Sequence, residues 1–542
     1  MRILKRYKFL CLCSVFFSMN SQAQLYINGA TLTIESGAYV AVQGDLTSNT
    51  DILGAGKVLM NGTVAQNISM SNKTIPNLEI SNGTNVSLTS DTKIGTSLLF
   101  TTGKLVLGNF NLSLSSTASA SGMLTSKFAE TNGTGQLFKE LSSDVSTFTM
   151  PVGVGTTYRP AYITTTGTYG ATAKVGIQAL AAAATNKPVR SADYINANWP
   201  VTQTGVTGTV YVKGLYQEGD LVGTEANIKG YYNNTTDWSS ATGTVDATNN
   251  FVGSNITGAS GTVTGIGKFV LVGARAFLQG AYAAGTGLMS ESLRTGSYIP
   301  TSDPYRTTDY ATAFGHVNNT TPETVVGTVF NTNPTAADNI VDWVFLELRN
   351  TNASPGNTVL QTRSALIQRD GDIVEIDGVS PVSFNNILNG NYAVTVRHRN
   401  HLAMSLSPIA GAIALNETKS TAYTTNVMDL RTTASSKIYG ATAGYTTANH
   451  PTLGTVNLLW SGNANPVAGA NTVKYSGAGN DRAVILTDLS SNELGNLTGY
   501  KKSDLNMNGT VKYSGAGNDR AFLLATSLSG VELTTRTQQI PN

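Results

Sequence analysis

The sequence predicts an all-β protein that ends in a small repeat of loops and helices. Its 542 residues include 55 glycines and many threonines but only 13% charged residues, a composition typical of strands joined by tight turns. Short alternating runs separated by Asn-Gly and Ser-Gly pairs fill the first part of the chain. Helix-forming composition is nearly absent before the C-terminal repeat. We therefore expect a β-solenoid-like region, two β-sandwich domains and the repeat, in that order.

Residues 1–23 have the pattern of a secretory signal peptide. Four basic residues among the first eight precede the apolar run Phe9–Phe17, which is too short to cross a bilayer. Small residues at the end of this segment offer a cleavage site, so we expect the mature chain to begin near Gln24. Both cysteines, Cys11 and Cys13, lie within the apolar run, and the mature protein would therefore have no disulfide.

The charge of the mature chain argues against a nucleic-acid partner. The whole sequence has 35 basic and 33 acidic residues, and loss of the four basic signal residues leaves 31 against 33. No basic run interleaved with aromatic residues follows, so the electrostatic pattern of a DNA- or RNA-binding protein is missing. No later apolar stretch approaches the length of a transmembrane helix, which predicts that the mature protein is exported whole.

Residues 24–122 are predicted to form a β-solenoid-like region of short strands. Alternating runs follow one another, separated by Asn-Gly, Ser-Gly and Gly-Asn turns that demand positive φ. Strands this short and evenly spaced suit the coils of a solenoid, and a flat sandwich sheet is the alternative. The runs are Leu25–Ile27, Thr31–Ile34, Tyr39–Val42, Lys57–Met60, Asn77–Ile80, Asn85–Leu88, Lys104–Leu107 and Asn111–Leu114.

Residues 123–275 carry longer alternating runs, which predict a first β-sandwich. Trp199 and Trp238 are interpreted as core anchors, with stacking against a carbohydrate as the alternative. The segment Gly265–Lys268 is only faintly similar to a phosphate-binding loop, because Phe269 stands where Ser or Thr would bind the metal. We therefore expect the start of a strand there.

Residues 276–435 are predicted to form a second β-sandwich. Its best-defined strands are Ile340–Arg349 and Arg363–Arg369. The pair Asp370-Gly371 then supplies the chemistry of a tight hairpin turn. A further strand is expected from Tyr392 to Leu402.

Two arginines and two histidines lie on this last strand. Arg397 and Arg399 are expected to pair with carboxylates of the Asp370–Asp377 hairpin and so to be structural. Strand periodicity places His398 and His401 on opposite faces of the sheet, which argues against a metal site. A metal site built from one histidine and a hairpin carboxylate is the less favoured alternative.

After a predicted linker, residues 436–458, the chain ends in a duplicated module, residues 459–542. The segment Thr472–Ala483 recurs letter for letter at Thr510–Ala521, and an identity of this length identifies a repeated unit. Each copy is expected to place a loop before a short helix that starts in the repeated Asn-Asp-Arg-Ala. Loop, helix, loop, helix is the layout of a dockerin.

The loop of the second copy has the oxygen ligands of a weak calcium site. Asp504, Asn506 and Asn508 alternate ahead of a glycine that can make the sharp turn of a calcium loop. The carbonyl of Thr510 and the carboxylate of Asp519 would complete the set. Because ligand charge governs affinity, we expect weak Ca²⁺ binding here. A metal-free pair of Asx-turn hairpins is the alternative.

The loop of the first copy is predicted to bind calcium more weakly still. Its candidate ligands are Asn463, Asn465 and Asp481, and Asp481 is the only acid among them. The extra residues Pro466–Asn471 disturb the spacing of these oxygens. Fewer charges and a less regular loop both lower the expected affinity.

The second half of the chain resembles the secreted haemagglutinin-like or adhesin-like proteins of the Bacteroidetes. The resemblance covers Phe277–Asn542 and rests on the Val-Asp-Trp-Val run, the Arg-Asp-Gly-Asp hairpin, the Val-Arg-His-Arg-Asn-His-Leu strand and the duplicated Val-Lys-Tyr-Ser-Gly motif. It implies a secreted or cell-surface protein with a dockerin-like end. The implied partner is a cohesin-like protein or a cell-surface glycan, and the resemblance assigns no catalytic residue.

The sequence offers no motif for nucleophilic or zinc-dependent catalysis. Gly-x-Ser-x-Gly and His-Glu-x-x-His are both missing, and the expected mature chain has no cysteine. We therefore predict a non-enzymatic adhesin or scaffold-like protein. The alternative is a polysaccharide-degrading enzyme, a glycoside hydrolase or lyase with a dockerin-like end, whose paired carboxylates cannot be picked out among 33 acidic residues.

Overall fold

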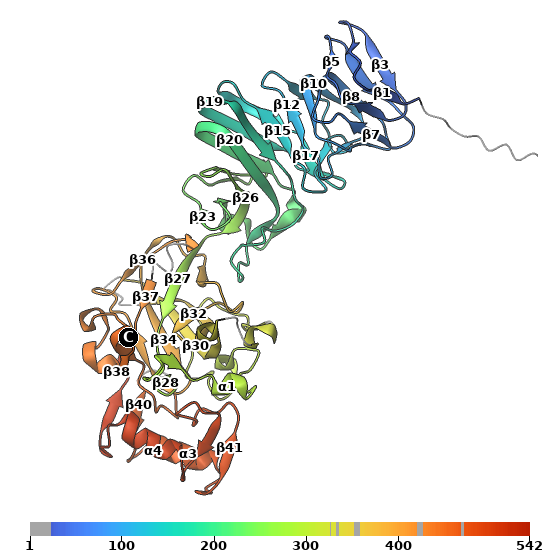
Figure 1. Ribbon diagram of the computed structural model, residues 1–542. Coiled ribbons are helices and arrows are strands. Elements are labelled where there is room, and N and C mark those ends of the chain that lie inside the picture. Colours follow the sequence, from blue (N-terminus) through green and yellow to red (C-terminus); the bar gives the residue numbers. More distant parts are fainter. Residues whose placement is uncertain are drawn as a thin grey trace, which may run out of the picture. The chain divides into compact units, whose positions relative to one another are not determined.

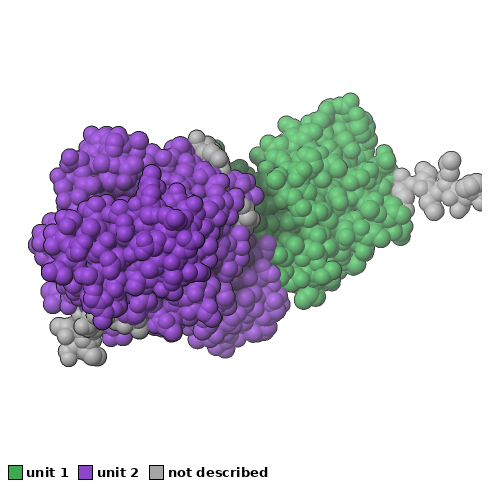
Figure 2. Space-filling view, turned by 90° about the horizontal axis from the view of Figure 1, so that it is seen from below, with its two compact units in different colours: residues 1–181, 199–215 green, residues 182–198, 216–542 purple. Residues whose placement is uncertain are grey.

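The computed structural model describes residues 23–325, 327–331, 335–351, 358–419, 427–467 and 471–541. Strands account for 45% of the chain and helices for 9%, which confirms the all-β class. The chain divides into two compact units, drawn in different colours in Figure 2. Unit 1 comprises residues 1–181 and 199–215, and unit 2 comprises residues 182–198 and 216–542. The expected signal peptide lies outside the described residues, except for its last residue.

Unit 1 begins with parallel coils, so the solenoid prediction is confirmed and the flat-sandwich alternative is wrong (Figure 1). One ladder of parallel strands contains β1 (Leu25–Ile27), β4 (Leu46–Ser48), β7 (Gln66–Ser69), β9 (Val86–Leu88), β11 (Leu105–Val106), β14 (Ala129–Glu130) and β17 (Val152–Val154). The second contains β3 (Tyr39–Val42), β6 (Lys57–Met60), β8 (Thr74–Ser81), β10 (Thr92–Thr102), β12 (Leu112–Leu114) and β15 (Leu137–Glu140). The others are β2 (Leu32–Thr33), β5 (Ile52–Leu53), β13 (Ser119–Ser121), β16 (Val145–Met150) and β18 (Thr157–Tyr158).

The coils differ in length, which explains why no strict period appears in the sequence. Val86 pairs with Leu105, and Leu105 pairs with Ala129, so successive coils use different numbers of residues. Apolar side chains at paired positions are fully buried, among them Leu46 and Ile68. Each coil therefore buries its apolar residues against those of its neighbours, which is how a solenoid gains stability.

Asparagine and aspartate side chains connect the turns of neighbouring coils. The backbone N–H of Asn67 donates to Asp45 Oδ1 (2.7 Å), and that of Asn111 donates to Asp91 Oδ1 (2.9 Å). Asn111 Oδ1 in turn accepts from the backbone N–H of Gln136 (3.0 Å). The Asn-rich turns thus provide acceptors for backbone donors at the ends of the short strands.

Two long antiparallel strands follow the coils. In unit 1, β19 (Ala161–Ile177) pairs with β15 and with the 199–215 part of β20 (Tyr194–Leu215). Trp199 lies in this part of β20 and is fully buried, and its Nε1 donates to the carbonyl of Arg159 (3.1 Å). Its interpretation as a core anchor is therefore confirmed.

Unit 2 contains a small antiparallel sheet before its main sheet. β22 (Ile228–Asn233) lies between β23 (Trp238–Ser239) and β26 (Ser260–Gly267). Trp238 is buried and meets Tyr231 edge-on, with 6.0 Å between ring centroids, so it too is a core residue. The remaining strands here are β21 (Leu221–Val222), β24 (Thr244–Asp246) and β25 (Phe251–Asn255).

A nine-stranded sheet forms the centre of unit 2, with the strand order β33-β27-β32-β31-β30-β34-β35 (Figure 1). These are β27 (Phe269–Arg275), β30 (Ile340–Arg349), β31 (Val359–Gln368), β32 (Asp372–Val374), β33 (Val382–Asn385), β34 (Gly390–His398) and β35 (His401–Ser405), with β36 (Ile413–Leu415) and β37 (Val427–Asp429) alongside. Gly371 joins β31 to β32 with φ of +95°, as the Asp-Gly turn predicted. Lys268 joins β26 to β27, so a strand does start at the end of the Gly265–Lys268 segment.

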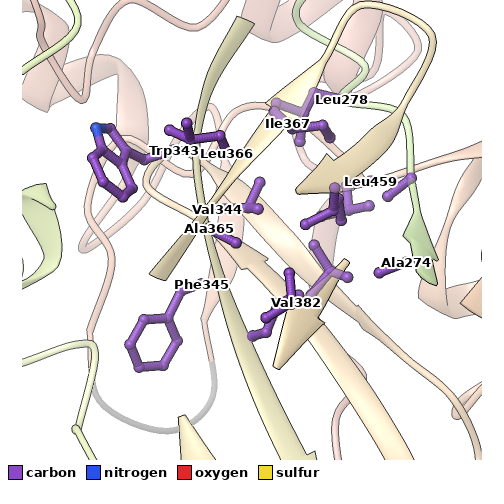
Figure 3. Close-up of a cluster of buried hydrophobic side chains, with 14 of the residues drawn as sticks. Ala274, Leu278, Trp343, Val344, Phe345, Ala365, Leu366, Ile367, Val382 and Leu459 are labelled. Carbon is purple, nitrogen blue, oxygen red and sulfur yellow. The ribbon is translucent and has the colours of Figure 1, made fainter. Parts of the chain in front are cut away.

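One hydrophobic core packs against this sheet (Figure 3). Every residue of β30 is buried, and Trp343 and Phe345 from this strand lie in the core, with Trp343 beside Leu366 of β31. Residues 436–458, interpreted as a linker, contain a hairpin whose Leu458 is buried in the same core. That hairpin is β38 (Thr446–His450) and β39 (Gly454–Leu458), and the smaller elements are β28 (Tyr282–Ala283), β29 (Leu288–Met289) and α1 (Ser292–Thr295).

The C-terminal repeat forms two loop-helix units that exchange strands. Its elements are β40 (Thr472–Lys474), α3 (Asp481–Asp488), β41 (Asn496–Thr498), β42 (Thr510–Lys512), α4 (Asp519–Phe522), a π-helical turn (Leu523–Ser527) and β43 (Thr535–Thr537). β40 pairs with β43, and β41 pairs with β42, so each copy supplies one strand to each two-stranded sheet. Asn480 and Asn518 cap the two helices by accepting from Ala483 N–H and Ala521 N–H. The repeated Asn-Asp-Arg-Ala is therefore a helix start, as predicted.

Candidate metal loops and the cluster that holds them

The loop of the second copy encloses two buried carboxylates, Asp504 and Asp519. Asp504 accepts from the backbone N–H groups of Asn508 (3.1 Å) and Gly509 (2.8 Å). Asp519, at the start of α4, accepts from the N–H of Leu505 (2.8 Å). These hydrogen bonds fold the loop around both acids, so two of the predicted ligands lie in the same loop.

The electrostatics of this loop favour a bound cation. Burial, and then the negative charge of Asp504, raise the pKa of Asp519 to about 7. Burial likewise raises the pKa of Asp504, while the positive charge of Arg399 opposes the rise. Two buried carboxylates that repel each other are stabilised by protonation or by a cation.

The other expected ligands of the second loop are its amides. Asn506 Oδ1 accepts from the N–H of Asn508 (3.1 Å), and Asn508 Oδ1 accepts from the N–H of Thr510 (2.8 Å). Each oxygen keeps a second lone pair, so these bonds are compatible with coordination. Throughout the described ranges, no group of three or more His, Cys, Asp or Glu side chains is arranged to hold a metal. The set of two carboxylates with amide and carbonyl oxygens fits Ca²⁺, which prefers oxygen ligands.

In the first copy Asn463 takes the position of Asp504. Asp481 accepts from the N–H groups of Ala464 (2.8 Å) and Lys474 (2.8 Å), just as Asp519 does from its own loop. Asn463 is buried, and no described residue bonds to its Oδ1. Asn465 is exposed, and half of the predicted insertion, residues 468–470, lies outside the described residues. The first loop thus brings one buried carboxylate where the second brings two.

The arginines of β34 and of its turn pair differently from the prediction. Arg397 Nη1 donates to Glu347 Oε1 (2.9 Å), and Arg399 Nε donates to Asp342 Oδ2 (3.0 Å). Both acids lie on β30, the strand next to β34, so the expected pairing with the Asp370–Asp377 hairpin is wrong. The sequence could not show that β30, and not the hairpin, lies beside β34.

The two histidines also lie differently from the prediction, because the chain turns back between them. His398 ends β34 and His401 begins β35, and their Nδ1 atoms are 3.0 Å apart. They therefore contact each other instead of lying on opposite faces. Both are completely buried, and burial is the main cause that lowers both pKa values.

The hydrogen bonds around the histidines assign their protons. His401 Nε2 accepts from the N–H of Gly280 (3.0 Å), so its proton lies on Nδ1, facing His398 Nδ1 and Asn400 Oδ1 (2.7 Å). His398 must then accept at Nδ1 and carry its proton on Nε2, which donates to Asp342 Oδ2 (3.0 Å). Protonation of either ring would place two donors face to face.

A cluster of buried polar and aromatic side chains connects the main sheet of unit 2 to the C-terminal repeat. Tyr500 donates to Asp342 Oδ1 (2.7 Å), and Arg399 stacks over the Tyr500 ring and donates to the carbonyl of Lys501. Asn400 Nδ2 donates to the carbonyl of Asp504 (2.7 Å). We call Asp342, His398, Arg399, His401 and Tyr500 the anchoring cluster. The anchoring cluster holds the chain at Tyr500 and Lys501, just before the second loop, and Asn400 fixes the loop backbone at the candidate ligand Asp504.

Further contacts show that the repeat is not a freely suspended module. Leu402 of β35 belongs to the hydrophobic core of the repeat. Gln538 Oε1 accepts from the N–H of Ala403 (3.1 Å), and Arg349 donates to the carbonyl of Pro541 (2.7 Å). The repeat and the main sheet therefore share both core and hydrogen bonds.

Comparisons with protein-family models, curated proteins and solved structures gave no match to this chain. In the described part of the chain, no helix has both the length and the apolar character needed to span a membrane.

Proposed function

We propose that this chain is a secreted or cell-surface adhesin or scaffold-like protein whose C-terminal repeat binds Ca²⁺. The observation that carries the calcium part is the buried pair Asp504 and Asp519, held by backbone N–H groups in one loop. A cation in this loop would relieve the repulsion between the two carboxylates. The adhesive part rests on the resemblance of residues 277–542 to adhesin-like proteins and on the signal-like N-terminal sequence.

The contacts of the repeat support a stabilising role for calcium. Because Asn400 bonds directly to the Asp504 carbonyl, an ordered second loop also orders the turn between β34 and β35. Metal binding to the folded state adds stability by mass action. Millimolar Ca²⁺ should therefore raise the melting temperature of the full chain, whereas Mg²⁺, which demands near-ideal octahedral geometry, should do so less.

Docking to a cohesin-like protein is a second candidate function, favoured by one observation. Leu494 and Leu533 follow the two helices at corresponding positions of the copies, and they are 85% and 87% exposed. Exposed leucines at a repeated position are suited to contact with a partner. If the repeat docks in this way, Leu494→Ser with Leu533→Ser should abolish capture of a cohesin domain and leave calcium binding intact.

A glycan array probed with the full chain tests the adhesive function. We expect binding to a limited set of cell-surface glycans, with the intact glycans recovered after incubation. Shortened or unsaturated products would instead support the polysaccharide-degrading alternative. If neither glycans nor cell surfaces retain the protein, the adhesin proposal fails.

A further inference from the structure

A crevice of about 600 Å³ opens on unit 1 where the parallel coils meet the long antiparallel strands. It is lined by Lys93 of β10, Glu140 of β15, the turn residue Ser116, and Tyr169 and Lys174 of β19. Figure 1 shows β10, β12, β15 and β19 in succession here. The volume lies within the range of about 300–1,000 Å³ found for ligand sites.

An interruption of strand pairing forms one wall of the crevice. Tyr169 pairs with Val206 and Lys174 pairs with Thr204, so residues 170–173 loop out opposite the single residue Gly205. Gly205 has φ of +66° and lies against Ala173, where a Cβ would come within 3.1 Å of the Ala173 backbone. The wall therefore belongs to the β19–β20 pairing itself, and the positive φ of Gly205 allows the strands to pass this irregularity.

The charges of the crevice are predominantly positive. The ammonium of Lys174 lies 4.4 Å from the centroid of the Phe138 ring, and no salt bridge to Lys93, Lys174 or Glu140 is formed by the described residues. Lys139 lies buried beside the crevice, and its Nζ donates to three carbonyls, those of Ser115 (2.7 Å), Ser116 (3.0 Å) and Ala118 (2.6 Å).

Lys139 adds its charge to the crevice at neutral pH. Burial lowers its pKa to about 8, so most molecules keep this ammonium charged at pH 7. Glu140 is the only acid among the described residues that line the crevice, and Asp144 accepts from the hydroxyl of the lining residue Tyr169 (3.0 Å). The lining itself carries the two ammonium groups of Lys93 and Lys174 against one carboxylate, which leaves a net positive charge that attracts anions.

We propose that this crevice binds acidic oligosaccharides, whose carboxylates or sulfates meet Lys93 and Lys174. This inference rests on the proposed adhesive function and names its ligand class. The hydroxyls of Ser116, Thr172 and Tyr169 line the same space and can bond sugar hydroxyls. Among the described lining residues, Leu141 has the only aliphatic side chain larger than a methyl group, and it is buried. A lipid or an apolar peptide therefore finds little surface here.

Binding of tetrasaccharides to the full chain tests the proposal. Galacturonate and heparin-derived tetrasaccharides represent the carboxylate and sulfate sources, and maltotetraose is the neutral probe. We expect the acidic probes, and not maltotetraose, to bind. Lys93→Glu and Lys174→Glu should each weaken binding at least fivefold, and the affinity should fall as salt rises.

Lys127→Glu is the matched control, because it makes the same change in net charge on unit 1, outside the crevice lining. Equal losses for Lys127→Glu and Lys174→Glu would overturn the proposal, since binding would then follow net charge alone. Equal affinity for hexaglutamate would also overturn it by showing no preference for sugars. If the array detects glycan binding that Lys93→Glu and Lys174→Glu leave unchanged, the adhesin proposal stands and the crevice is not its site.

Discussion

Removal of the Asp342 carboxylate should destabilise unit 2 more than any exposed ion pair can. Asp342 is completely buried and accepts from Arg399 (3.0 Å), His398 (3.0 Å) and Tyr500 (2.7 Å). Asp342→Asn removes the charge that compensates the equally buried Arg399. Loss of one partner from a buried pair costs about 3–5 kcal/mol, because the other charge remains buried without compensation. For a unit of this size we expect a fall in melting temperature of roughly 5–10 °C.

Calorimetric melting of the full chain measures this effect, and two further variants test its cause. Asp372→Asn breaks the partly exposed pair with Arg275 and should cost less than about 1 kcal/mol. Asp342→Asn combined with Arg399→Met removes both charges and should be more stable than Asp342→Asn alone. If Asp342→Asn melts like the wild type, or if the double variant loses the sum of both single effects, the anchoring cluster does not act as a coupled buried unit.

Three further predictions address pH, the solenoid and processing. With calcium bound, the free energy of unfolding should fall as the pH drops below about 6.5. Each of His398 and His401 should contribute about 1.4 kcal/mol per pH unit to this fall, because the unfolded chain takes up protons that the buried rings exclude. Without calcium, Asp519, whose folded pKa is raised to about 7, also takes up a proton in the folded state, so the free energy of unfolding measured by chemical denaturation should depend less on pH between 5 and 6.5. Asn111→Ala should lower the free energy of unfolding of unit 1 by about 1–2 kcal/mol, because it removes the acceptor of the Gln136 N–H. The calorimetric transition of unit 2 should stay unchanged. Mass spectrometry of exported protein should find an N-terminus near Gln24, and recovery of Met1 or of a peptide containing Cys11 would contradict the signal-peptide interpretation.

Local patterns in the sequence identified many elements because their structural causes are local. Asn-Gly and Ser-Gly turns delimit the short solenoid strands, Gly371 supplies the positive φ of its hairpin, and the repeated Asn480 and Asn518 cap their helices. The solenoid period was not visible, because its coils differ in length.

The contacts that anchor the repeat could not be predicted, because they join residues far apart in the chain. Asp342 meets Tyr500 across 158 residues, and only the order of the strands brings β30 beside β34. Strand periodicity misplaced His398 and His401, because it continues a strand through the turn at Asn400. One available signal was Asp342 itself, an acid in the middle of the otherwise apolar run Ile340–Leu346.

Titration calorimetry of the full chain with Ca²⁺ tests the central claim most directly. We expect binding on the order of 10⁻⁴ M, as for extracellular modules with few acidic ligands. Asp504→Asn should abolish the heat, whereas Asp481→Asn should leave most of it, because only the second loop holds two buried carboxylates. No heat at millimolar Ca²⁺, or a larger loss for Asp481→Asn than for Asp504→Asn, would contradict the claim that the second loop is a calcium site.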